Sequence, residues 1–134
     1  MDCLVDTSVW VDFLNGQTNV QVEQFRSLLL AGSMATTSVV IMEILQGIRS
    51  DRQCRNIQQK MKCLTHYAID EQCYVESAML YRQLRKKGVT IRKSVDCLIA
   101  AVCIHYRVPI LHRDRDFSQI VAHSDLMNFA PDIH

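Results

Sequence analysis

The sequence predicts an α/β fold in which helices cover both faces of a mostly parallel sheet. Short apolar runs alternate with helical segments along the chain, an order of elements that is typical of α/β proteins. These runs are apolar throughout, which indicates strands that are buried on both faces. The chain has 134 residues, 49% of them hydrophobic, so we expect residues 1–134 to form one domain with a substantial core.

Strands are expected where short apolar runs stand between helical segments. They fall at residues 3–5, 34–37, 66–69 and 108–112, with a short fifth strand around residues 126–129. The first strand ends at Asp6, and Asp114 and Asp116, in the stretch HRDRDF, directly follow the fourth strand. Polar residues therefore gather at the carboxyl ends of two strands.

The first two helices are indicated by their caps and by apolar spacing. Thr7 or Ser8 is expected to cap the first helix, which stops near residues 15–16. Gly32 is expected to end the second helix. The apolar positions of the second helix, at i, i+3 and i+7, are Val22, Phe25 and Leu29.

Four further helices complete the alternation. They are expected at residues 39–48, 54–64, 75–87 and 95–106. Gly88 is a natural stop for the third of these helices, and Ser94 can cap the fourth. This last helix is apolar nearly all round, so we expect it to be buried on most sides.

Composition excludes several classes of protein. The longest apolar run, at residues 97–104, is far shorter than the roughly 20 residues that span a bilayer. The N-terminus lacks the basic segment of a signal peptide, so we expect neither a membrane partner nor export. The six cysteines form no C-x-x-C pair and mostly lie in apolar surroundings. Reduced thiols and a cytoplasmic protein are therefore expected.

Five acidic residues stand where a carboxylate is unusual. One ends the first strand, two follow the fourth strand, one opens the most apolar helix, and one is the only charge in an apolar helix. They are Asp6, Asp114, Asp116, Asp96 and Glu43. Because ligands of an open parallel sheet bind outside the carboxyl ends of its strands, these side chains are expected to converge on one edge.

A divalent cation would make such a group of acids tolerable. Carboxylates that lie close together repel one another, and the cost rises as water is excluded. Oxygen ligands without His or Cys favour Mg²⁺ or Mn²⁺ over zinc. Such an ion makes hydroxide available near neutral pH and stabilises a leaving oxygen. The five acids therefore predict metal-assisted displacement at phosphorus.

Each acid also has a purely structural interpretation. Asp6 can cap the helix that follows it, and Asp96 can be a first-turn acid that the helix dipole favours. Asp114 and Asp116 can form Asx turns. A buried salt bridge to an arginine is the alternative for Glu43, because an unpaired Glu in an apolar helix is costly.

The acids lie in four segments that form a pattern. The segments are VDTSVWVDFLNG at 5–16, VVIMEILQG at 39–47, SVDCLIAA at 94–101 and ILHRDRDFSQI at 110–120. In this order they resemble the PIN-domain ribonucleases, and most closely the VapC-type toxins of bacterial toxin–antitoxin pairs. The resemblance implies a three-layer α/β/α sandwich. It also implies Mg²⁺- or Mn²⁺-dependent endonucleolytic cleavage of RNA, often structured RNA such as tRNA or rRNA.

The resemblance also implies roles for individual positions. The family's four catalytic, metal-binding acids match Asp6, Glu43, Asp96 and Asp114. Asp116 stands where close relatives keep a further metal-binding acid, and Ser8 would orient a ligand or phosphate through its hydroxyl. Family members are commonly homodimers, and a cognate antitoxin inhibits them by wrapping the toxin and placing a basic side chain in the acidic site.

The distribution of cations fits an RNA partner better than the formal net charge of +1 does. When the five acids are set aside as metal-bound, 15 cations face 9 acids. Arg92, Arg113 and Arg115 stand next to the proposed site in the sequence. We expect them to contact a phosphate or to pair with an acid.

Two other functions fit parts of the pattern. A HAD-like Mg²⁺-dependent phosphohydrolase needs an acid two residues after its nucleophilic Asp, whereas Ser8 stands two residues after Asp6. A non-catalytic partner-binding α/β module would instead use apolar residues such as Trp10 and Phe13 to hold its partner. Such a module would be indifferent to metal removal and to the loss of Asp6 or Asp96.

Overall fold

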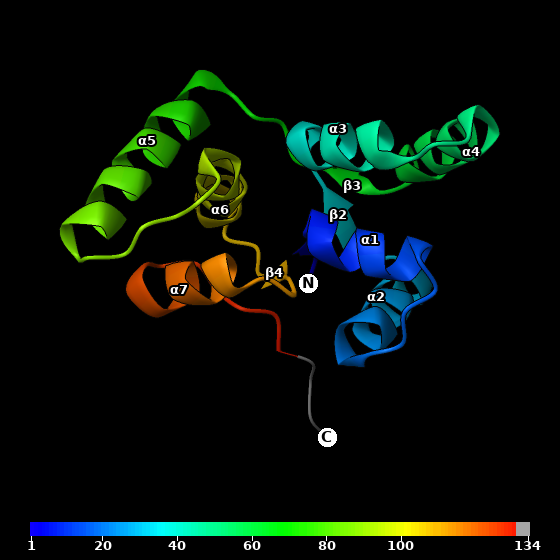
Figure 1. Cartoon of the computed structure of the whole chain (residues 1–134), viewed down its shortest axis with the longest axis horizontal. Helices are drawn as coiled ribbons and strands as arrows, with labels where there is room; N and C mark the ends of the chain where they lie inside the picture. Colours follow the sequence, from blue (N-terminus) through cyan, green and yellow to red (C-terminus); the bar gives the residue numbers. More distant parts are fainter. Residues whose placement is uncertain (131–134) are drawn as a thin grey trace.

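The computed structural model describes residues 1–130 and contains a four-stranded parallel sheet (Figure 1). The strands are β1 (Cys3–Val5), β2 (Met34–Thr36), β3 (Thr65–His66) and β4 (Ile110–Leu111). Their order in the sheet is β3-β2-β1-β4, and every neighbouring pair is parallel. The predicted α/β class with a parallel sheet is confirmed.

Seven helices cover this sheet within the described residues. The first four are α1 (Thr7–Leu14), α2 (Val20–Ala31), α3 (Ser38–Gly47) and α4 (Asp51–Met61), and the others are α5 (Glu71–Lys86), α6 (Ser94–Tyr106) and α7 (Arg115–His123). Right-handed crossovers place the helices before β3 on one face and those between β3 and β4 on the other. Figure 1 shows α1 to α4 on the right of the view and α5 to α7 on the left. The architecture is the expected α/β/α sandwich.

β1 lies at the centre of the core. Cys3, Leu4 and Val5 each have 0% exposure, and because successive strand residues point to opposite faces, both faces are covered. Leu4 pairs with Ala35 of β2 and with Ile110 of β4. The buried strand therefore fixes the position of its end, where Asp6 follows.

Aromatic packing joins α1 to α2. The rings of Trp10 and Phe25 meet edge to face at 4.8 Å, and Phe13 stacks on Phe25 at 4.4 Å. Phe25 is fully buried, as predicted, but Leu29 is 47% exposed and Leu28 takes its place in the core at 6% exposure. The inward face of α2 thus runs through i, i+3 and i+6 rather than i, i+3 and i+7.

Two helix caps differ from the prediction. Asp6, rather than Thr7 or Ser8, caps α1, because its carboxylate accepts the backbone N–H of Ser8. Lys93 precedes α6 without a side-chain cap, and Ser94 is the first helical residue. The structural interpretation of Asp6 as a cap is therefore correct, and it leaves the carboxylate at the sheet edge.

The third strand is shorter than predicted. It covers Thr65–His66, and the chain leaves the sheet after Tyr67, whose N–H still bonds to Thr36. The carbonyl of Ala68 instead accepts a 2.6 Å hydrogen bond from the hydroxyl of Tyr106 in α6. The strand thus gives way to a connection toward α5.

The C-terminal part differs most from the sequence-based prediction. The helix α7 was not predicted, although Asp114 caps it and Phe117 and Ile120 bury its inner face. The predicted fifth strand is reduced to a single parallel bridge between Ile110 and Asn128. β4 has only two residues and so offers a neighbour too little backbone for a longer ladder.

None of the helices within residues 1–130 combines the length and the apolar character that crossing a membrane requires. All six cysteines are free.

Candidate metal and catalytic site

The acidic residues gather at one point of the sheet. The chain runs from β1 outward to β2 and β3 and then returns to the opposite side of β1 as β4. The strand order therefore reverses between β1 and β4, and open α/β sheets bind ligands outside the carboxyl ends of strands at such a point. Asp6 follows β1, and Asp114 lies just beyond β4.

Asp6 is held by the first turn of α1. Asp6 is only 4% exposed. Its Oδ2 accepts two hydrogen bonds from Ser8, one from the backbone N–H at 3.0 Å and one from the hydroxyl at 2.7 Å. Burial raises the pKa of Asp6, the hydrogen bonds from Ser8 lower it, and the charge of Glu43 raises it further. Asp6 is therefore an oriented carboxylate with a second acid beside it.

Glu43 occupies the middle of α3 and is half-buried. Its Oε1 accepts a 2.8 Å hydrogen bond from the hydroxyl of Thr7. Among the ion pairs of residues 1–130, none involves Glu43, so the expected alternative of a salt bridge to an arginine is wrong. The carboxylate is thus partnered by a neutral hydroxyl rather than by a cation.

Asp96 is the most enclosed acid of the group. It is 2% exposed, and its Oδ2 is buried without a hydrogen-bond partner among the described residues. Burial raises the pKa of Asp96 to about 7, Lys93 opposes the shift, and the charges of Asp6, Asp114 and Asp116 add to it. A buried, unpartnered carboxylate oxygen among other acids is the environment that a cation would stabilise.

Asp114 and Asp116 complete a tight cluster with Asp96. One carboxylate oxygen from each of the three residues lies within 4.8 Å of the others. Asp114 caps α7 and accepts the N–H of Asp116 at 2.8 Å, so the first turn of the helix folds Asp116 toward the same point. Asp116 is only 6% exposed. The turn that caps α7 therefore also brings the carboxylates of Asp114 and Asp116 to the cluster.

The five predicted acids thus form a continuous array rather than one compact cluster. Asp96, Asp114 and Asp116 are close enough to share an ion, and their oxygen donors suit a hard divalent cation. Besides burial, the charge of Asp6 contributes to the raised pKa of Asp96, and the charge of Glu43 contributes to the raised pKa of Asp6. Glu43 forms the outer end of the array.

Two of the three predicted arginines pair with acids. Arg92 Nε lies 3.3 Å from Oδ2 of Asp116, and Arg92 Nη2 lies 3.9 Å from Oδ1 of Asp114. Arg113 Nη1 lies 3.1 Å from Oδ2 of Asp12. Arg115 is exposed and forms no ion pair with a residue in the described range.

Ser8 has a more specific place than predicted. Its hydroxyl donates to Asp6 and accepts the N–H of Arg113 at 3.0 Å. It therefore connects the loop after β4 to the start of α1. This contact holds the two acidic segments in register.

Sequence reasoning missed two residues that position the acidic loop. His112 Nδ1 accepts the N–H of Asp114 at 3.2 Å, and burial lowers the pKa of His112. Asp12 accepts hydrogen bonds from Arg113 and, at 3.2 Å, from Asn19. The position of His112 as the first residue of HRDRDF was a usable signal, whereas nothing in the sequence pairs Asp12 with a residue so distant along the chain.

Comparisons with known proteins find similarity along most of the chain. The PIN domain family model matches residues 3–122. Ribonuclease VapC11 of Mycobacterium tuberculosis is 32% identical over 126 residues, which cover 92% of this chain and 94% of that protein.

Solved structures show the same fold. VapBC2 from Rickettsia felis, bound to a DNA fragment from its promoter, has a TM-score of 0.75 at 20% identity and covers 97% of this chain and 100% of its own. VapBC-1 from nontypeable Haemophilus influenzae has a TM-score of 0.72 at 18% identity, covering 96% and 97%.

Proposed function

The chain belongs to the PIN-domain family, among its VapC ribonucleases, and we propose that it is a metal-dependent endoribonuclease that acts as the toxin of a toxin–antitoxin pair. Residues 1–134 would act as a single nuclease domain. The observation that carries the proposal is the buried, unpartnered Oδ2 of Asp96 beside Asp114 and Asp116. A structural role for these acids leaves that oxygen unexplained.

PIN-domain nucleases generally use a divalent metal ion, and the buried acidic cluster supplies the ligands for one. Mg²⁺ or Mn²⁺ is the proposed ion, because the donors are all carboxylate oxygens. Asp96, Asp114 and Asp116 would hold it. When bound, the ion supplies a hydroxide near neutral pH and stabilises the leaving oxygen of the phosphodiester.

The chain's own residues would orient the reaction. Asp6 is fixed by two hydrogen bonds from Ser8. Glu43, fixed by Thr7, is the more exposed of the two acids. We assign this pair to positioning the attacking water at the edge of the cluster. Asp6 and Glu43 would therefore be catalytic carboxylates of the site together with Asp96 and Asp114.

The proposed substrate is structured RNA of the tRNA or rRNA class. Arg115, exposed at the first turn of α7, can contact a phosphate near the acids. A homodimer and a cognate antitoxin are the proposed protein partners, in keeping with the VapBC complexes that share the fold. An RNA substrate and six free cysteines are both consistent with a cytoplasmic enzyme.

The test is cleavage of RNA by the purified chain with Mg²⁺ or Mn²⁺. EDTA should stop the reaction, and Asp6→Asn and Asp96→Asn should each abolish it. Asp51→Asn, at an exposed acid in the first turn of α4, is the matched control and should cleave normally. Cleavage that persists in EDTA or in Asp96→Asn would overturn the proposal.

The same protein preparations separate the two alternatives. A HAD-like phosphohydrolase would hydrolyse a small aryl phosphate monoester and spare RNA, whereas a binding module would cleave neither. Sequencing of RNA ends after a pulse of expression, with Asp6→Asn as the control, identifies the target.

A further inference from the structure

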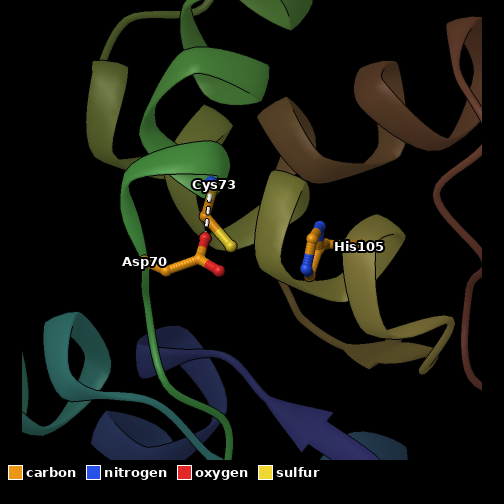
Figure 2. A group of neighbouring side chains, drawn as sticks. All are labelled: Asp70, Cys73 and His105. Carbon is orange, nitrogen blue, oxygen red and sulfur yellow. Dashed lines mark hydrogen bonds between the residues drawn. The ribbon is translucent and has the colours of Figure 1, made fainter.

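A second group of metal-binding side chains lies where α5 and α6 pack together (Figure 2). Asp70 caps α5, Cys73 lies in its first turn, and His105 lies near the end of α6. A carboxylate oxygen, the thiol sulfur and a ring nitrogen, one from each residue, all lie within 4.8 Å of one another. This group is separate from the acidic cluster, because Asp96 and His105 stand at opposite ends of α6, about 13 Å apart along the helix.

The start of α5 holds the Asp70 carboxylate in place. Its Oδ1 accepts the N–H of Cys73 at 3.0 Å, which leaves Oδ2 free of that bond. Asp70 is an exposed residue. One carboxylate oxygen of an exposed residue is thus fixed close to Cys73 and His105.

Cys73 provides a sulfur donor from the buried side of the group. The residue has 0% exposure, yet Figure 2 shows its sulfur directed to the side on which the Asp70 carboxylate and the His105 ring lie. A small apolar side chain would fill the same core position without presenting a sulfur to a carboxylate. The buried thiol therefore places a sulfur donor beside the carboxylate of Asp70 and the ring of His105.

Glu76, which is not one of the three residues of the group, holds the ring of His105. The two carboxylate oxygens of Glu76 lie 3.2 and 3.3 Å from Nδ1 of His105. A carboxylate that orients the imidazole is the usual outer partner of a metal-binding histidine. Glu76 lies one turn of α5 after Cys73, so one helix supplies both a ligand and the positioning residue.

We propose that Asp70, Cys73 and His105 bind a transition-metal ion of the Zn²⁺ class, with Glu76 positioning His105. Sulfur, nitrogen and oxygen donors together select Zn²⁺ or Co²⁺ over Mg²⁺. Ligand atoms around tetrahedral zinc lie about 3.5 Å apart, which small rotations of these side chains would reach. The bound ion would tie the start of α5 to the end of α6, the helix that carries Asp96. This site does not depend on the proposed nuclease activity.

The test uses the full chain without an affinity tag, stripped of metal with a chelator and then titrated with Co²⁺. Thiolate-to-Co²⁺ charge-transfer absorption should appear and saturate with one Co²⁺ ion at this site, because an ion held by the carboxylates of the acidic cluster has no thiolate ligand, and Zn²⁺ should displace the band. Zn²⁺ should also raise the midpoint of thermal unfolding of the Asp96→Asn variant, in which the acidic cluster is disabled. A titration without thiolate absorption would overturn the proposal.

Substitutions assign the ligands. Cys73→Ser, Asp70→Asn and His105→Gln should each lose the absorption band, and Asp70→Asn keeps a side chain that caps helices well. Glu76→Gln should weaken Co²⁺ binding about tenfold. If Cys73→Ser fails to fold, the exposed His105 still decides the question, because His105→Gln leaves the core intact.

Two controls distinguish this site from the rest of the chain. Cys63→Ser removes an exposed cysteine outside the group, and Asp96→Asn disables the acidic cluster. Both variants should keep the band. A band that persists in His105→Gln, or that disappears in Cys63→Ser, would contradict the assignment. RNA cleavage has no part in these measurements, so failure of the nuclease proposal would leave their outcome unchanged.

Discussion

The hydroxyl of Thr7 donates a 2.8 Å hydrogen bond to Oε1 of Glu43. The contact joins the first residue of α1 to the middle of α3, two segments that are distant in the chain. It partly offsets the cost of placing a carboxylate in an otherwise apolar helix. Thr7 directly follows Asp6, so the same turn that orients Asp6 also holds Glu43 beside it.

We expect Glu43→Gln to reduce RNA cleavage on the order of 100-fold while changing the free energy of unfolding by only about 0.5 kcal/mol. The amide oxygen of Gln still accepts the Thr7 bond, but the negative charge is lost. Cleavage rates at saturating Mg²⁺ and urea denaturation measure the two effects. Equal losses of activity and stability would indicate a structural role for Glu43.

Asp96 should make the stability of the metal-free protein fall as pH rises. Its pKa is raised from 3.8 to about 7 in the folded state, so between these values the folded protein holds more protons than the unfolded chain. Each unit of that upward shift corresponds to about 1.4 kcal/mol. Urea denaturation from pH 4 to pH 8 in EDTA measures the slope.

Asp96→Asn isolates this contribution from other titrating groups. The raised pKa of Asp6 acts in the same direction. The lowered pKa of His112 acts in the opposite direction, because it makes stability rise with pH at pH values below the ordinary pKa of histidine. The difference between wild type and Asp96→Asn should therefore grow from pH 4 to pH 7 and shrink when Mg²⁺ or Mn²⁺ is added. A difference independent of pH would contradict the prediction.

The sequence predicted the acidic site more fully than the elements around it. Asp6 and Asp114 could be placed because the ends of parallel strands meet at one edge, a rule that needs no side-chain detail. The helix α7 was missed because Asp114 and Asp116, at its start, were interpreted as turn residues, although Asp114 is also a helix cap. The pairing of Asp12 with Arg113 is set by tertiary packing, which local patterns do not encode.

The Asp12–Arg113 pair should hold the acidic loop against α1. Arg113 is 55% exposed at its side chain, and such pairs contribute about 0.2–1 kcal/mol, so Asp12→Ala should reduce cleavage by no more than about fivefold. Single-turnover rates measure the effect. Added salt weakens the remaining electrostatic contacts of the acidic loop, so the cleavage rate of Asp12→Ala should fall further as the salt concentration rises. A loss as large as that of Asp96→Asn would place Asp12 in the catalytic group instead.

Arg92 should compete with the metal ion for the acidic cluster. It lies 3.3 Å from Asp116, with a side chain that is 66% exposed, so its removal relieves a modest electrostatic competition. Arg92→Gln should therefore tighten Mn²⁺ binding by about two- to fivefold in calorimetry. Arg82→Gln, at a cation of α5 that has no ion pair with the cluster, is the matched control. Weaker Mn²⁺ binding in Arg92→Gln would contradict this role.

Arg115 should act on RNA rather than on metal. It is exposed beside the cluster and has no acidic partner among residues 1–130, so its charge is free to meet a phosphate. Arg115→Gln, in an Asp6→Asn background that prevents cleavage, should weaken RNA binding uniformly across sequences. The slope of log affinity against log salt should become shallower by about one. An unchanged salt slope together with altered Mn²⁺ affinity would instead assign Arg115 to the acids, because only a released phosphate contact changes the number of displaced counterions.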